Sequence, residues 1–64
     1  MQDLAALARQ TAETAEKVAR DAEAIAADPD TGLLEALAAR TLALASGRLA
    51  ELAREVAELP KDLS

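Results

Sequence analysis

The sequence predicts an all-α fold: an antiparallel two-helix hairpin, with helices at about residues 3–27 and 32–59, that assembles into a helical bundle. Both segments are rich in Ala, Leu, Glu, Arg and Lys, which are strong helix formers. In both, apolar residues recur every seven positions. The connection between them is so short that the helices must lie antiparallel. We expect residues 1–64 to form a single helical-hairpin domain.

The first helix is expected to begin at Asp3, whose carboxylate accepts from the free amides of the first turn. Neither Gly nor Pro interrupts the chain before Asp28. Two heptad columns of alanine lie beside a column of larger residues, which contains Leu4, Thr11, Val18 and Ile25. The opposite face is charged, and its residues place two i,i+4 ion pairs, Glu13–Lys17 and Glu16–Arg20.

Residues 28–32, Asp-Pro-Asp-Thr-Gly, end the first helix, because a residue that precedes proline is pushed out of the α region. Two readings of the restart stay open. Either Asp28 caps the second helix with Pro29 as its first residue, or the turn runs to Thr31 and the helix opens there. The triplet at 30–32 matches the short signature of aspartic proteases, but that chemistry needs paired aspartates on a β scaffold. A calcium loop counted from Asp28 lacks its Gly and Glu. We therefore interpret the segment as a turn.

The second helix repeats the heptad pattern and ends before Pro60. When the chain is folded at about residue 30, its register matches that of the first helix. We therefore expect the large residues of both helices to pack together within one chain. The predicted intrachain core comprises Leu4, Leu7, Val18, Ile25, Leu42, Leu49, Leu52 and Val56.

Residues 33–45 carry a second apolar face, whose 3-4-3 spacing is typical of a coiled-coil seam. The seam continues into Arg48, Glu51 and Glu55, so it is apolar only in the half near the turn. We expect this face to contact another chain. The predicted oligomer interface comprises Leu33, Leu34, Leu37, Thr41, Leu44 and Gly47.

Small and polar residues inside the helices need their own explanation. Gly47 costs about 1 kcal/mol relative to Ala in mid-helix, which favours close approach of a neighbouring backbone over a bend. Three hydroxyls, of Thr11, Thr14 and Ser46, are expected near one level of the hairpin. We favour bonds to carbonyls one turn back in their own helices over a buried cluster that specifies the assembly. Glu35 is expected to favour the helix dipole as a first-turn acid.

The composition excludes several classes of function. Without Cys or His the chain has neither disulfides nor the usual zinc ligands, and we expect no enzyme, no metal and no cofactor. The formal charge of −5 is spread along the chain without a basic face, so we expect no nucleic-acid partner. No apolar run is long enough for a membrane span, and no small-molecule site is indicated. The N-terminus lacks the order of a signal peptide; localisation is unknown, and soluble cytoplasmic expression is the default.

The chain resembles de novo designed α-helical hairpins that form symmetric homo-oligomers. The resemblance rests on the Ala/Leu/Glu/Arg vocabulary of LLEALAARTLALASGRLAELAREVAEL, the compact ADPDTG turn, and the absence of aromatic residues, Cys and His. In length and central turn it also resembles the RNA-binding Rop hairpin, which dimerises into a four-helix bundle. That family's RNA contacts call for polar and basic residues and an aromatic residue on the outer face of the first helix. In this chain acidic residues lie among the basic ones on that face, and aromatic residues are absent. The bundle is implied, and the RNA activity is not.

We therefore expect a self-assembling structural protein, a designed alanine-rich homo-oligomer whose partner is itself. So small a chain without aromatic residues has little to build a core from, which favours burial between copies. A dimer is favoured over trimers to hexamers. The alternative is a helix-binding interaction module, a heteromeric partner or adaptor fragment, that uses the apolar face Leu34, Leu37, Thr41 and Leu44.

Overall fold

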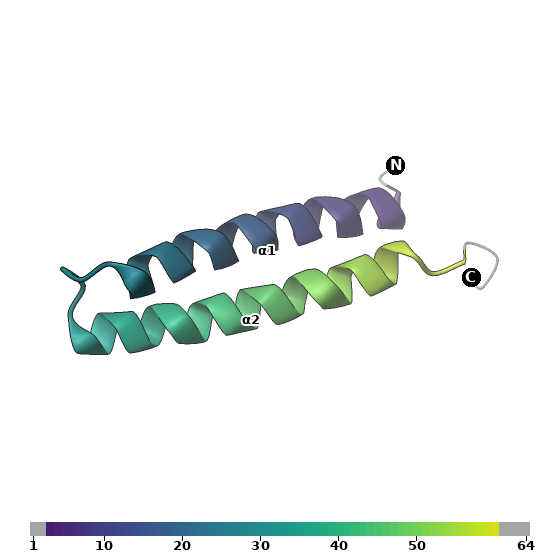
Figure 1. The fold of residues 1–64 in the computed structure, drawn as a ribbon. Helices are drawn as coiled ribbons and strands as arrows, with labels where there is room; N and C mark the ends of the chain where they lie inside the picture. The colour runs from purple at the N-terminus through teal and green to yellow at the C-terminus, as the bar shows by residue number, and fades with distance from the viewer. Residues whose placement is uncertain (1–2, 61–64) are drawn as a thin grey trace.

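The computed structural model describes residues 3–60, which form two antiparallel helices joined by a short turn (Figure 1). Helix α1 spans Leu4–Ala27 and helix α2 spans Leu33–Ala57. The described ends of the chain lie together, opposite the turn. The predicted all-α hairpin is thus confirmed, because α1 packs against α2. Assembly of hairpins into a larger bundle stays a prediction.

Helix α1 begins where the sequence predicts, because Asp3 has extended backbone angles and its carboxylate accepts from the amide of Ala5 at 3.3 Å. The helix ends at Asp28, whose ψ of 123° reflects the steric restriction imposed by Pro29. The Asp28 carboxylate accepts from the amide of Asp30 at 2.9 Å. The Thr31 hydroxyl donates to the carbonyl of Ile25 at 2.7 Å and satisfies one group of the last turn of α1. These bonds confirm the turn interpretation of residues 28–32.

Helix α2 begins one turn later than proline capping would place it. Gly32 is its N-cap and makes no side-chain bond to the first turn, so the reading in which Asp28 caps α2 is wrong. The turn runs through Thr31, as the second reading holds, and the helix opens two residues after it. At the other end α2 stops at Ala57, two residues short of the predicted end, because Pro60 restricts Leu59.

Alanine fills the contact between the two helices. All the buried residues are small, and we call this set the alanine seam: Ala8, Ala12, Ala15, Ala22, Ala39, Ala43, Ser46, Ala50 and Ala53. Ala12 is fully buried. Side chains this small let the helix axes approach more closely than the usual ~8–10 Å. The hairpin core therefore consists of methyl groups and one hydroxyl.

The large apolar side chains lie outside the seam. In residues 3–60 every Leu, Ile and Val is at least 36% exposed. The prediction that eight of them form the core within one chain is wrong for the single hairpin: Leu4, Leu7, Val18, Ile25, Leu42, Leu49, Leu52 and Val56 are all exposed. The physical reason is that in each helix the column of large residues borders two columns of alanine, and the two alanine columns face the partner helix.

Candidate oligomer interface

One side of the hairpin presents apolar residues from both helices. Leu7, Val18 and Leu49 line one groove there, and the other large residues of the heptad columns follow the same side. We call this side the two-helix face and define it by the eight residues that the heptad pattern predicts as core: Leu4, Leu7, Val18, Ile25, Leu42, Leu49, Leu52 and Val56. Along its middle runs a groove with Ala15 and Ser46 at the seam and Leu7, Val18 and Leu49 beside it. The face extends from Leu4 to Ile25 on α1, which is almost the full length of the helix.

Hydroxyl groups lie in the same groove, as the sequence predicts for Thr11, Thr14 and Ser46. The Thr11 hydroxyl donates to the carbonyl of Leu7 at 2.9 Å, which confirms for this residue the bond one turn back along its own helix. No buried side-chain polar atom in the described part of the chain lacks a hydrogen-bond partner. An apolar surface that covers the groove would therefore leave the Thr11 hydroxyl hydrogen-bonded.

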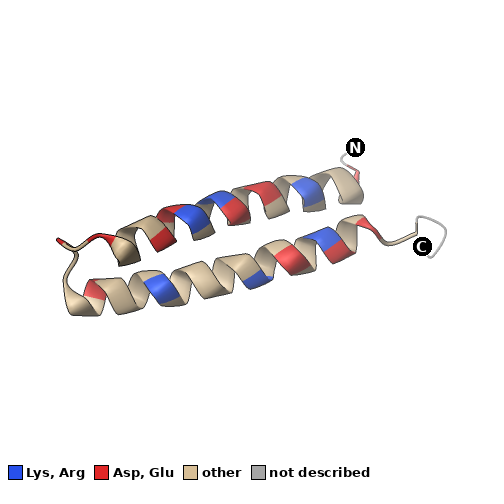
Figure 2. Ribbon diagram, in the orientation of Figure 1, with Lys and Arg blue, Asp and Glu red and all other residues tan. Residues whose placement is uncertain are grey.

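The other side of the hairpin is charged. Charged residues of both signs occur on both helices (Figure 2). Arg54 of α2 donates to the Glu16 carboxylate of α1 at 2.6 Å, an ion pair that joins the two helices. A shallow groove here is lined by Arg20, Glu51 and this pair. The hydrogen bond from Arg54 lowers the pKa of Glu16 below its ordinary value, against the smaller opposing effect of desolvation, and the same contact raises the pKa of Arg54.

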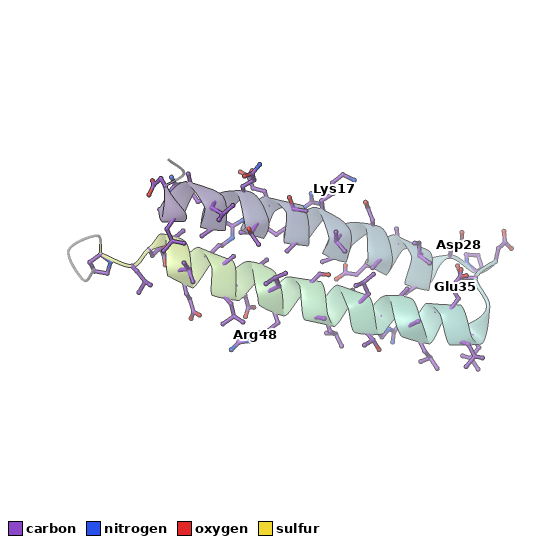
Figure 3. The ribbon with its side chains drawn as sticks, turned by 180° about the vertical axis from the view of Figure 1, so that it is seen from behind. Lys17, Asp28, Glu35 and Arg48 are labelled. Atoms are coloured by element: carbon purple, nitrogen blue, oxygen red, sulfur yellow. The ribbon has the colours of Figure 1, made fainter. Side chains whose placement is uncertain are left out.

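The ion pairs within each helix differ from those expected. Lys17 pairs with Asp21 at 2.9 Å instead of Glu13, and Glu16 turns to Arg54 instead of Arg20. On α2, Arg48 pairs with Glu51 at 3.1 Å. Lys17 and Arg48 point away from the contact between the helices (Figure 3). These pairs are solvent-exposed and contribute little stability, in the range of about 0–1 kcal/mol each.

The outer surface of α2 near the turn is apolar as well. We call it the α2 ridge and define it by Leu34, Leu37, Thr41 and Leu44. Its leucines are 82%, 54% and 72% exposed, and neighbouring Leu33 is 76% exposed. The Thr41 hydroxyl donates to the carbonyl of Leu37 at 3.1 Å, so the threonine leaves no free donor on the ridge. The four residues of the ridge, all predicted to lie in the oligomer interface, are thus accessible to another chain.

Gly47, the last predicted interface residue, lies elsewhere. It lines the groove on the charged side, together with Glu16 and Arg54. A Cβ atom built on Gly47 would meet nothing within 4 Å, so the predicted close approach of a neighbouring backbone is wrong within the hairpin. Glu35 is exposed in the first turn of α2, as predicted. There its negative charge interacts favourably with the positive end of the helix dipole.

Comparison with protein families, with curated proteins and with solved structures found no match to this chain. Within residues 3–60 no group of His, Cys, Asp or Glu is placed to hold a metal ion. Neither described helix is long and apolar enough to cross a membrane.

The two-helix face is the surface that sequence reasoning misassigned. A signal for it is nonetheless present, because each helix carries two full heptad columns of small residues side by side. When both helices have such a pair, the small columns can face each other and leave the large columns at one side. The cross-helix pair Glu16–Arg54 was missed for the same reason, since it depends on which columns face inward.

Proposed function

We propose that this chain is a self-assembling structural protein, in which copies of the hairpin pack against one another through the two-helix face. The observation that carries the proposal is that the seam buries only small residues, while every large apolar side chain in residues 3–60 remains exposed. Burial of large apolar side chains is the dominant favourable contribution to folding. In a single hairpin that contribution is mostly unrealised.

The dimensions of the hairpin support the same proposal. Its Cα radius of gyration is 14.9 Å, whereas a compact domain of this length has about 11 Å. It exposes 5037 Å², about 1,100 Å² more than the ~3,900 Å² typical of a folded monomer of 6.6 kDa. A standard interface buries about 800 Å² per partner. The excess surface is therefore large enough to supply such an interface.

The polarity of the surfaces supports the two-helix face over the charged side as the contact between copies. The charged side holds the Glu16–Arg54 pair, and burying it would desolvate both ions. No charged residue lines the groove in the two-helix face, and the Thr11 hydroxyl in that groove is already bonded. A second copy that packs face to face would complete a four-helix bundle with the large side chains inside.

The proposal includes no catalysis and no ligand: assembly is the function. Its origin as a de novo designed protein is also a proposal, supported by the agreement of helix propensity, heptad pattern and turn chemistry along the chain. The alternative function, a module that binds a helix of another protein through the α2 ridge, predicts instead a chain that is monomeric by itself.

Native mass spectrometry of the purified chain tests the proposal. We expect an assembly whose mass is at least twice the 6.6 kDa of one chain. Replacement of two residues across the groove, Leu7→Glu with Leu49→Glu, should disperse the assembly and lower its helicity. The control, Ala6→Glu with Ala24→Glu, adds the same charge to exposed positions of α1 and should keep the mass. A wild-type chain that is monomeric and fully helical at micromolar concentration would overturn the proposal, and unchanged mass in the groove variant would overturn its choice of surface.

A further inference from the structure

The α2 ridge is a second apolar surface that face-to-face packing does not cover. Its leucines are exposed because they lie on the side of α2 that does not contact α1. Packing through the two-helix face adds a partner beside both helices, whereas the ridge points outward from α2 alone. A folded protein rarely leaves such a contiguous apolar patch in water unless the patch has a partner.

We propose that the α2 ridge packs antiparallel against the α2 ridge of another copy, so that the assembly is a dimer of dimers containing four chains. The inference rests on the proposed function, because it assumes that copies already pair through the two-helix face. It adds a second contact that is different from the first. Two different contacts, each made between like surfaces, give the dihedral symmetry common among tetramers when their two-fold axes meet at a right angle.

The lengths of the two surfaces determine which surface meets which. The large apolar residues of the two-helix face extend from Leu4 to Ile25 on α1 and from Leu42 to Val56 on α2, with hydroxyl groups between them. The ridge is apolar only from Leu34 to Leu44, and Arg48 follows it in the same column. A ridge docked on a two-helix face would set charged residues against the remaining half of that face. Each surface therefore finds a match of equal length only in its own kind.

Charge determines the direction of the ridge contact. The turn end of the hairpin is entirely acidic, because residues 21–39 contain five acids and neither Lys nor Arg. Asp28 and Glu35 both lie at this end, while Arg48 lies on α2 well away from it (Figure 3). Parallel ridges would bring two acidic ends together, and like charges repel. Antiparallel ridges separate the two acidic ends. Each end then lies toward the segment that holds Arg48, Glu51 and Glu55, where one cation offsets part of the acidic charge.

The excess surface also fits two contacts. A hairpin with one interface of standard size would bury about 800 Å² per partner, which leaves part of the ~1,100 Å² excess exposed. The ridge is short, so it supplies a smaller second contact. The spacing of Leu34, Leu37, Thr41 and Leu44 is that of a coiled-coil seam, which is complementary to another helix of the same spacing.

Native mass spectrometry of ridge variants tests this inference. The wild-type chain should have four times the monomer mass. Leu37→Glu with Leu44→Glu should halve the mass of the assembly and leave a helical dimer. The control, Ala6→Glu with Ala24→Glu, carries the same added charge on α1 and should remain tetrameric. Because buried charge can unfold a helix, a second variant, Leu37→Ala with Leu44→Ala, removes the contact without charge and should also shift the assembly to dimers.

The outcomes separate the two proposals. A wild-type dimer whose mass the ridge variants leave unchanged would overturn the ridge contact while supporting assembly through the two-helix face; the ridge would then be free for a helix of another protein. An odd number of chains would overturn pairing between like surfaces. Ridge variants that fall to monomers would show that the ridge is the primary contact. A monomeric wild type would overturn both proposals.

Discussion

Substitution of Ala12 by leucine would probe the alanine seam directly. Ala12 is completely inaccessible, with the seam packed against it. Leucine adds three carbon atoms at a position without free space, so either the helices separate or the side chain is forced out of a favoured rotamer. Overpacking of this kind costs about 1–3 kcal/mol. We expect Ala12→Leu to lower the free energy of unfolding by that amount.

The matched control is Ala24→Leu, the same substitution at an exposed position of α1. Alanine and leucine have similar helix propensities, so the control should change stability by only a few tenths of a kcal/mol. Urea unfolding followed by circular dichroism, at one fixed chain concentration, measures both variants. Equal stability of the Ala12 and Ala24 variants would refute the close alanine packing of the two helices.

Three further predictions follow from single contacts. Gly47→Ala should raise stability by about 1 kcal/mol, because alanine favours the helix and its Cβ meets open space; a loss measured by thermal unfolding would mean that another chain packs there. Asp3→Ala should cost about 0.5–2 kcal/mol through loss of the N-cap, visible as a lower unfolding midpoint in urea. Glu16→Gln should destabilise the chain at pH 7. Since the Arg54 contact lowers the pKa of Glu16, the stability it contributes is present above the unfolded pKa of about 4.3 and is lost as pH falls through the folded pKa. The difference from wild type should therefore vanish near pH 2, and a difference that persists there would contradict the assignment; Glu23→Gln is the control.

Local signals in the sequence predicted most of the fold. The Asp3 cap, the break before Pro29 and the absence of Gly and Pro from residues 2–27 each act within one or two turns of the chain. Such short-range effects are readable from the order of residues alone. The predicted ends of α2 were less accurate, because Gly32 caps without a side chain and the helix stops at Ala57, before the residue that Pro60 restricts.

The identity of the core was not predictable in the same way. A heptad pattern shows which columns are apolar. It does not show whether the column of large residues or the adjacent column of small residues faces the partner helix. In the hairpin the small columns face inward: Ala12 is buried, while Val18 and Leu49 remain exposed beside the seam. The contact thereby gains close approach of the backbones and forgoes burial of large side chains. That choice depends on three-dimensional packing, and it also fixes the Glu16–Arg54 pair on the opposite side.

The position of the ridge was predictable, because the sequence shows both where its apolar residues recur and where charged residues replace them. Residues 33–45 contain only Glu35 and Arg40 as charged residues, and the column of Leu34 becomes charged at Arg48. A helix that needs to bury one stripe only would carry polar residues there. What covers the ridge is a property of the assembly, which the residues of one chain do not specify.

Dilution of the chain tests the central claim, that copies of the hairpin supply the burial that one hairpin lacks. Helicity by circular dichroism and mass by native mass spectrometry would be followed together as the chain is diluted from high micromolar to nanomolar concentration. Because assembly stabilises the folded chain by mass action, we predict that helicity falls in the same concentration range in which the assembly dissociates. Helicity that stays constant while the mass falls to 6.6 kDa would contradict the claim, since the alanine seam would then suffice by itself.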